Sequence, residues 1–221
     1  MNRQRIILLW ILVSFFACIT ILFVWDKIHQ AQTHFAGGTN PDAERATLPP
    51  MRPPTTSDAP SRGSADRKAL VIDQYADYTC LYCRITEPEL LQAMAQSSLP
   101  VRLVWHDLPV VTTQPDAMTA ALAGRCAKEQ NKFWEMHDAL FLTQSFDTAS
   151  LIELARAEGL NADIFKQCLN SGRHLKAIQQ AVTVAKNHNI RSAPTFFIGS
   201  TSYSGFMNTA QFLAIIQQAA P

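Results

Sequence analysis

The sequence is short of charge and shows no excess of either sign. Charged residues make up 17% of the 221 positions, and the formal net charge is only +1. This balance disfavours a basic nucleic-acid-binding protein and an acidic tail. Five cysteines are too few for a small scaffold held together by many disulfides. Hydrophobic residues nevertheless reach 48%, which excludes global disorder and points to a membrane segment.

The first 25 residues account for part of this hydrophobic excess. Arg3 and Arg5 precede residues 6–25, a run of 20 without a charge. As a helix this run would span about 30 Å, the thickness of the hydrocarbon core of a bilayer. Because positive charge favours the cytoplasmic side, we predict a single-pass anchor over 1–25 in the inner (cytoplasmic) membrane, with the rest of the chain in the periplasm or its equivalent. The alternative is a cleaved signal peptide, which would have a shorter apolar core and a small-x-small cleavage site.

Residues 26–66 have a different composition. They contain six prolines among small and polar residues and show no hydrophobic period. Such a segment is typical of an extended, flexible tether, which at this length spans roughly 35 Å. Residues 67–221 then form one domain without net charge.

The order of expected elements in this domain indicates an α/β fold. An apolar strand, a helix and a second strand form a parallel βαβ unit. A block of helices follows, and two short strands and a last helix end the chain. The strands are expected at 69–75, 101–105, 195–198 and 201–204, and the helices outside the block at about 80–96 and 209–218. Without the helical block this is the minimal thioredoxin order. We therefore predict a thioredoxin-like fold with an inserted helical subdomain at about 110–188.

The motif that carries chemistry is Cys80-Leu81-Tyr82-Cys83, at the start of the first helix. Unpaired N–H groups and the helix dipole favour negative charge there, so a thiolate at Cys80 is stabilised. The spacing of three residues lets Cys83 reach Cys80 within one turn. Zinc sites also use this motif, but they need a second ligand pair, and the sequence has no second CxxC and no HxxxH. We therefore predict a redox pair, with no metal and no other cofactor.

Three segments match a known pattern. Residues 75–83 read aromatic-x-Asp-aromatic-x-Cys-x-x-Cys, residues 131–138 are similar to a Gly-Lys-Phe-Trp-x-x-His-Asp helix start, and residues 192–198 are similar to a cis-proline strand. On these motifs, over about residues 70–212, the sequence resembles the DsbA-like branch of the thioredoxin superfamily.

The resemblance implies a role for particular residues. Cys80 would be the exposed nucleophile, Cys83 the buried resolving thiol and Pro194 the cis-proline that faces them. An incoming peptide would pair as an added strand with the backbone beside the proline. Substrate contacts are therefore expected from Tyr82, Ala193 and Thr195.

Two positions depart from the family pattern. Leu81 stands where the family usually has proline, and Gln74 stands where many relatives have a glutamate that can accept the proton of the resolving cysteine. Asp77 is expected to cap the turn that enters the helix. The uncharged pair between the cysteines suggests a Cys80 pKa between that of thioredoxin, about 7, and that of DsbA, about 3.5.

The remaining candidates receive simpler interpretations. Cys126 and Cys168 lie in the helical block and are either two buried thiols or a structural disulfide, which we favour because a compartment that oxidises CxxC also oxidises free thiols. His106 follows the second strand and is expected on the surface of a loop. Trp134 and His137 are expected to pack in the core, with a side-chain hydrogen bond.

The leading functional hypothesis is a membrane-tethered thiol–disulfide oxidoreductase that forms disulfides in exported proteins. Its partners would be cysteine-containing exported proteins, a membrane redox partner and the membrane itself, but not nucleic acid. We expect a monomer, because the tether offers no dimerisation module. The alternatives are a disulfide reductase and, in a different class, a copper(I)-handling module, which the lack of a Met/His cluster near Cys80 disfavours.

Overall fold

The computed structural model describes residues 59–111 and 116–219, which all lie in one compact unit of the chain. The expected anchor at 1–25 and most of the expected tether fall outside these residues and stay predictions. Within the two described ranges, none of the helices combines the length and the apolar character needed to cross a membrane.

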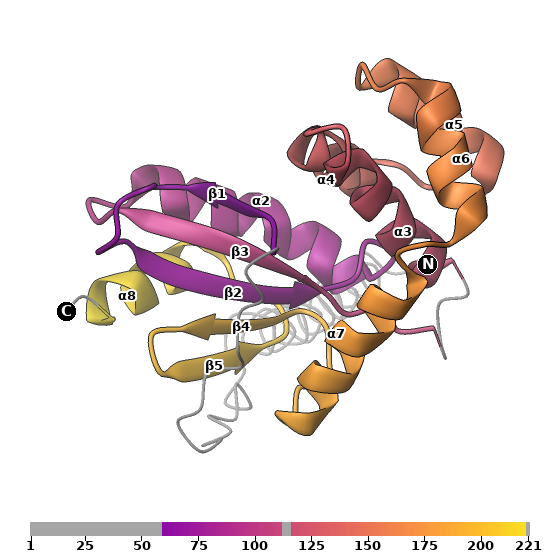
Figure 1. Ribbon diagram of the computed structural model, residues 1–221. Coiled ribbons are helices and arrows are strands. Elements are labelled where there is room, and N and C mark those ends of the chain that lie inside the picture. Colours follow the sequence, from indigo (N-terminus) through magenta and orange to yellow (C-terminus); the bar gives the residue numbers. More distant parts are fainter. Residues whose placement is uncertain (1–58, 112–115, 220–221) are drawn as a thin grey trace, which may run out of the picture. The chain divides into compact units, whose positions relative to one another are not determined.

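A five-stranded mixed sheet forms the centre of the described domain (Figure 1). The strand order is β1-β3-β2-β4-β5, and all neighbours are antiparallel except the central pair β2 and β3. The helix α2 connects that parallel pair, so the expected βαβ unit is confirmed. The strands are β1 (Ser61–Gly63), β2 (Leu70–Ala76), β3 (Val101–Asp107), β4 (Thr195–Ile198) and β5 (Thr201–Ser204), and α2 is Leu81–Gln96.

The edge strand β1 corrects the expected tether boundary at residue 66. Ser61–Gly63 pairs with β3, so these residues belong to the domain and not to a flexible segment. Gly63 has φ +99°, and a Cβ there would lie 2.5 Å from the carbonyl oxygen of Val101, so only glycine fits this approach. A three-residue strand is too short to show alternation, which is why the sequence pattern missed it.

The helices divide into two groups. α2 and α8 lie against each other on one face of the sheet, where Leu90 of α2 and Phe212 of α8 form a core cluster with Ile72 of β2 and Phe196 of β4. The other helices form the insertion between β3 and β4 that the sequence predicts, with α7 packed near β3. The bounds are α3 (Ala117–Lys128), α4 (Phe133–Leu142), α5 (Thr148–Ala157), α6 (Ala162–Ser171), α7 (Leu175–Asn187) and α8 (Thr209–Gln218).

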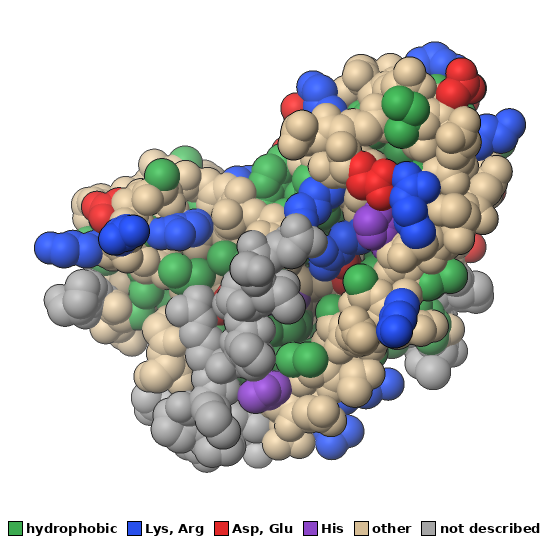
Figure 2. All heavy atoms as spheres, viewed as in Figure 1, with side chains coloured by type: hydrophobic (Ala, Val, Ile, Leu, Met, Phe, Trp, Pro, Cys, Tyr) green, Lys and Arg blue, Asp and Glu red, His purple; other side chains and the backbone are tan. Residues whose placement is uncertain are grey.

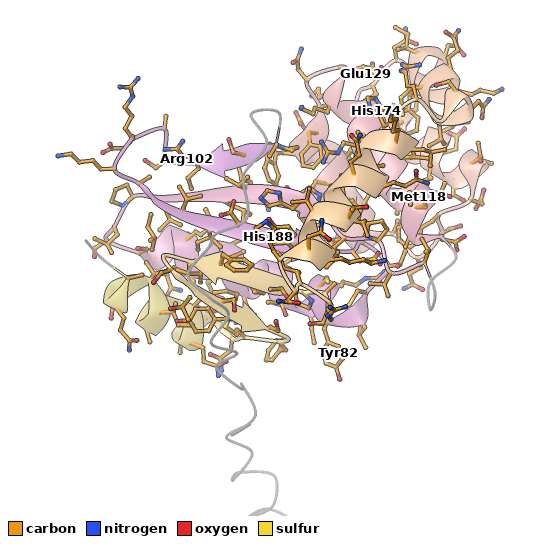
Figure 3. The ribbon with its side chains drawn as sticks, turned by 60° about the horizontal axis from the view of Figure 1, so that its bottom comes forward. Tyr82, Arg102, Met118, Glu129, His174 and His188 are labelled. Atoms are coloured by element: carbon orange, nitrogen blue, oxygen red, sulfur yellow. A yellow bond between two sulfur atoms is a disulfide. The ribbon has the colours of Figure 1, made fainter. Side chains whose placement is uncertain are left out.

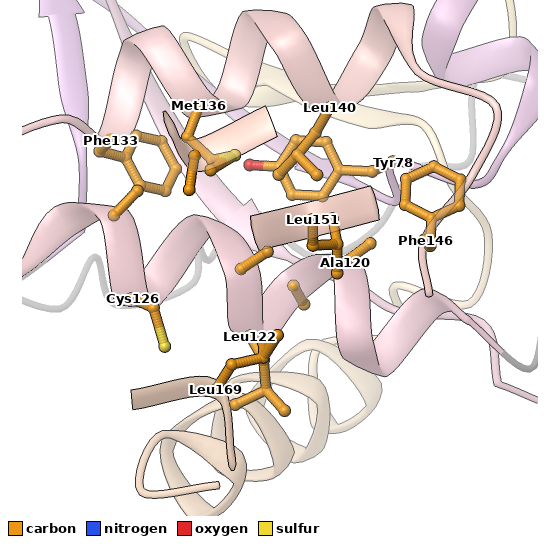
Figure 4. Close-up of a cluster of buried hydrophobic side chains, with 14 of the residues drawn as sticks. Tyr78, Ala120, Leu122, Cys126, Phe133, Met136, Leu140, Phe146, Leu151 and Leu169 are labelled. Carbon is orange, nitrogen blue, oxygen red and sulfur yellow. The ribbon is translucent and has the colours of Figure 1, made fainter. Parts of the chain in front are cut away.

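A hydrophobic core joins the helical insertion to the end of the sheet. Tyr78, which follows β2, lies among the side chains of α3 and α4, beside Leu140 (Figure 4). Its ring stacks on Trp105 of β3 with 4.8 Å between the ring centroids. Since Tyr78 stands two residues before Cys80, this packing fixes the turn that carries the motif against both parts of the domain.

Charges of both signs are scattered over the described residues of the face shown in Figure 2, in keeping with the small net charge.

Candidate functional site

The turn between β2 and α2 is held by the side chain of Asp77. One carboxylate oxygen accepts hydrogen bonds from the backbone N–H and the hydroxyl of Thr79, at 2.8 and 2.7 Å. The other accepts from the N–H of Val110, at 2.7 Å, and so ties the turn to the segment after β3. Asp77 therefore caps the turn, as expected, and places Cys80 at the N-cap position of α2.

The two cysteines of the motif are free thiols in different environments. Cys80 is partly exposed and Cys83 is buried. The hydrogen bond from the Cys83 thiol lowers the pKa of Cys80 from 9.0 to about 6, helped by the backbone N–H groups of Cys83 and Tyr82 and opposed by burial. Burial raises the pKa of Cys83 far above its ordinary value, and its hydrogen bond to Cys80 adds to the effect. At neutral pH, Cys80 is therefore the thiolate and Cys83 holds the proton.

The loop before β4 faces Cys80. The Ala193–Pro194 peptide bond is cis, and the carbonyl oxygen of Ala193 lies 3.5 Å from the sulfur of Cys80. The carbonyl of Pro194 accepts from the N–H of Gly205, at 2.9 Å, and Gly205 has a positive φ of +88°. These contacts bring Cys80, Cys83, Ala193 and Pro194 together, as the sequence predicts; the catalytic roles stay predictions.

The residues expected to touch a substrate have unequal access. Tyr82 is 58% exposed and projects from the start of α2 (Figure 3), and Leu81 beside it is 64% exposed. Thr195 is only 3% exposed, and its strand is paired on both sides, with β2 and with β5. Its hydroxyl donates to the carbonyl of Ser192 at 2.7 Å. That Thr195 contacts a substrate stays a prediction, and its burial leaves little side-chain surface for such a contact.

A buried polar cluster on the inner face of α2 was not predicted from the sequence. The carboxylate of Glu87 accepts hydrogen bonds from Arg62 at 2.6 Å and Gln74 at 2.7 Å, and lies 3.2 Å from a ring nitrogen of His137. The other ring nitrogen of His137 meets the hydroxyl of Tyr78 at 3.0 Å. Burial opposes the charge on Glu87, yet the hydrogen bonds of His137 and Gln74 and the charge of Arg62 keep its pKa below the ordinary value.

Glu87 sits four residues after Cys83, on the same buried face of α2. Gln74, which replaces the family's glutamate, therefore donates to a carboxylate that the helix supplies. The signal in the sequence was a glutamate in line with the apolar positions of an amphipathic helix. The expectation for His137, core packing with a hydrogen bond, is confirmed.

The expectation for His106 is wrong. The strand β3 continues to Asp107, so His106 lies within the sheet and is 7% exposed. A ring nitrogen lies 3.0 Å from the carboxylate of Asp73, and the ring stacks on Tyr75 with centroids 4.3 Å apart. Polar residues at a strand end gave no sign that the ladder extends this far.

Cys126 and Cys168 form a disulfide that links α3 to α6, with 5.7 Å between their Cα atoms. Both residues are buried.

Elsewhere, ligand atoms of Glu87, His137 and Asp138 lie within 4.8 Å of one another, but Arg62 and Gln74 already donate hydrogen bonds to the carboxylate of Glu87. The structure therefore gives these acidic residues a structural explanation that needs no metal ion.

The family is shown by comparison with known proteins. A sequence model described as Thioredoxin matches residues 57–218. The chain belongs to the thioredoxin family. Among curated relatives, the Na(+)/H(+) antiporter NhaA 3 of Salinispora tropica is 33% identical over 159 residues, 72% of this chain and 24% of that protein. The Na(+)/H(+) antiporter NhaA of Herminiimonas arsenicoxydans is 26% identical over 157 residues, 71% of this chain and 25% of that protein. The chain thus spans about a quarter of the length of these relatives.

Solved structures share the fold at lower sequence identity. A thioredoxin-like oxidoreductase from Silicibacter pomeroyi has a TM-score of 0.65 at 22% identity, covering 74% of this chain and 93% of its own. BdbD from Bacillus subtilis has a TM-score of 0.65 at 17% identity, covering 73% and 92%. The thiol-disulfide exchange protein alpha-DsbA2 from Wolbachia pipientis has a TM-score of 0.64 at 15% identity, and the match covers 72% of this chain and 86% of that protein. These structures share the thioredoxin-like fold, so the expected fold is confirmed.

Proposed function

We propose that the protein is a thiol–disulfide oxidoreductase that forms disulfides in exported proteins through Cys80 and Cys83. One observation carries the proposal: a partly exposed thiol with a pKa of about 6 at the start of a helix, beside a buried thiol that keeps its proton. This pairing separates an attacking or leaving sulfur from a resolving one.

The reaction begins with the disulfide between Cys80 and Cys83. A substrate thiolate attacks the sulfur of Cys80, the bond to Cys83 breaks, and Cys83 leaves as a thiolate that takes up a proton. A second substrate thiolate then attacks the substrate's own sulfur in the mixed disulfide and releases Cys80 as a thiolate. The substrate loses two electrons and gains a disulfide, and the protein is left as a dithiol. A partner that accepts two electrons must then restore the oxidised form.

The low pKa of Cys80 supports the oxidising direction, because a stabilised thiolate favours the reduced protein and makes its disulfide a stronger oxidant. A value of about 6 lies between those of thioredoxin, about 7, and DsbA, about 3.5, as the sequence suggests. Because it lies nearer to thioredoxin, a disulfide reductase is the second candidate.

The proposed place of work is outside the cytoplasm, next to the inner membrane. The uncharged run at 6–25 supports a single-pass anchor there. A structural neighbour from Salmonella enterica serovar Typhimurium is named a periplasmic thioredoxin-like protein. Several curated relatives are named Na(+)/H(+) antiporters, so a similar segment occurs in proteins that work in a membrane. The proposed partners are exported cysteine-containing proteins and a membrane protein that exchanges electrons with a monomer of this chain.

A trapping experiment tests the activity. The Cys83→Ser variant of the full-length chain, produced in cells, should accumulate mixed disulfides with several exported proteins through Cys80. The matched Cys80→Ser variant should trap none. If the Cys83→Ser variant forms no mixed disulfide and instead loses bound copper(I) relative to the unaltered chain, the oxidoreductase proposal fails and a copper carrier replaces it.

The reduction potential decides the direction. The full-length chain is equilibrated in glutathione buffers, and the alkylated species are read by mass spectrometry. A potential near that of DsbA, about −120 mV, would support disulfide formation, whereas one near that of thioredoxin, about −270 mV, would replace it with the reductase alternative.

A further inference from the structure

A groove of about 420 Å³ lies between the segment after β3 and the helix α7. One wall consists of residues 108–111, and the other of the α7 residues Gln179, Val182, Thr183 and Lys186 followed by Ile190 and Arg191. Met118 of α3 also lines the groove, and Figure 3 shows this residue beside α7. None of the residues that line the groove belongs to the motif, and Leu108 and Ile190 also pack in a core cluster with Phe197.

One wall is connected to a residue that contacts the sulfur of Cys83, and the other to a residue that contacts the sulfur of Cys80. The N–H of Val110 donates to Asp77, whose own N–H lies 3.5 Å from the sulfur of Cys83. On the other side, Arg191 stands two residues before Ala193, whose carbonyl faces Cys80. Consecutive Cα atoms are about 3.8 Å apart, so Arg191 lies no more than about 8 Å along the chain from Ala193. A peptide that pairs with the backbone at Ala193 therefore extends toward this groove.

The lining has one sign of charge. Lys186 and Arg191 are both exposed, and no acidic residue is found among the described residues that line the groove. The wall formed by residues 108–111 is apolar, whereas α7 contributes the polar side chains of Gln179 and Thr183 beside Val182. A volume of this size is at the lower end for ligand pockets, enough for a few side chains of an extended segment but not for a folded domain.

We propose that this groove binds the segment next to the reactive cysteine of a substrate protein, and that it selects an apolar side chain accompanied by an aspartate or glutamate. The inference rests on the proposed function, which supplies the substrate and the mixed disulfide. It adds a preference that the sulfur chemistry alone does not impose. Lys186 and Arg191 would pair with the substrate carboxylate, and the apolar wall would cover the neighbouring side chain.

The test uses two synthetic peptides, each with one cysteine and one leucine. They differ only at the position two residues from the cysteine, which is aspartate in one peptide and lysine in the other. The oxidised full-length chain is mixed with each, and the rate constant for mixed-disulfide formation at Cys80 is measured by acid quenching and mass spectrometry. The aspartate peptide should react about five- to tenfold faster at low salt, because each charge at a solvent-exposed rim contributes modestly. Raising the salt concentration should reduce the difference.

Charge reversal supplies the control. The double variant Lys186→Glu, Arg191→Glu should prefer the lysine peptide, whereas Lys166→Glu, which changes an exposed lysine on α6 outside the groove, should keep the original preference. Equal rates for the two peptides with the unaltered chain, or a preference that survives the double reversal, would overturn the groove assignment. If neither peptide, even in large excess, reduces the disulfide between Cys80 and Cys83, the oxidoreductase function itself is refuted, so the two failures are distinguishable.

Discussion

The hydrogen bond between the two thiols should set the reactivity of Cys80. It is the largest cause that lowers the Cys80 pKa to about 6. A hydrogen bond to a charged group contributes about 1.5–3 kcal/mol, which corresponds to roughly one to two pKa units. The variant Cys83→Ala, which has no donor, should therefore raise the Cys80 pKa by about that amount. Cys83→Ser keeps a hydroxyl donor and should raise it less.

The assay is the rate of alkylation of Cys80 against pH, resolved by mass spectrometry so that the chain's other cysteines do not contribute. The backbone N–H groups at the start of α2 are present in both variants, so neither pKa should return fully to 9.0. A Cys83→Ala variant that still titrates near 6 would refute the reasoning, because the helix start alone would then account for the thiolate. Equal shifts in both variants would also contradict it, since the donor would then be irrelevant.

The same pKa predicts how the reduction potential depends on pH. The Cys80 pKa in the folded, reduced protein lies below 9.0, so the thiolate stabilises this form fully above pH 9 and loses that effect as the pH falls through about 6. At pH 7 the stabilisation amounts to at most about 1.4 kcal/mol, or about 30 mV, and water at the partly exposed sulfur reduces it. Above about pH 6 the potential should change by about 30 mV per pH unit, and below it by about 59 mV. A single slope from pH 5 to 8 would contradict the assigned thiolate.

Further substitutions test the surroundings of the site. Asp77→Asn removes a negative charge that raises the pKa of the nucleophile, so that pKa should fall slightly in an alkylation titration; a rise would contradict the assigned electrostatics. Arg62→Ala leaves the buried carboxylate of Glu87 without its cation and should lower the free energy of unfolding in urea by about 3 kcal/mol, whereas a loss under 1 kcal/mol would mean that the pair is not buried in solution. Replacing both Cys126 and Cys168 by alanine opens a loop of 42 residues and should cost up to about 4 kcal/mol while leaving the rate of thiol alkylation in the motif unchanged.

The sequence predicted the parts of the fold that have strong local signals. The parallel unit around α2, the helical insertion and the final strands follow from hydrophobic period and from turn residues. The cysteine motif and the proline loop could be placed next to each other only through the family resemblance, because no local pattern shows that residues 113 positions apart meet.

What the sequence missed depends on contacts distant along the chain. Glu87 stands in line with the apolar positions of its helix, but its burial could not be inferred, because its partner Arg62 comes from a strand that the sequence did not predict. His106 was misplaced because a strand end is set by its partner, here β2, more than by its own residues. The burial of Thr195 has the same origin, since its strand is paired on both sides.

The edge strand β1 also has a mechanical consequence. It is the first described element, so tension that arrives from the N-terminal side of the chain acts first on its three residue pairs with β3. Because Arg62 of that strand binds Glu87 of α2 and Asp138 of α4, the load is shared between the helix that carries the cysteines and the helical insertion. Tension from the N-terminal side would thus act on the helix that carries the cysteines and on the helical insertion before it reaches the rest of the core.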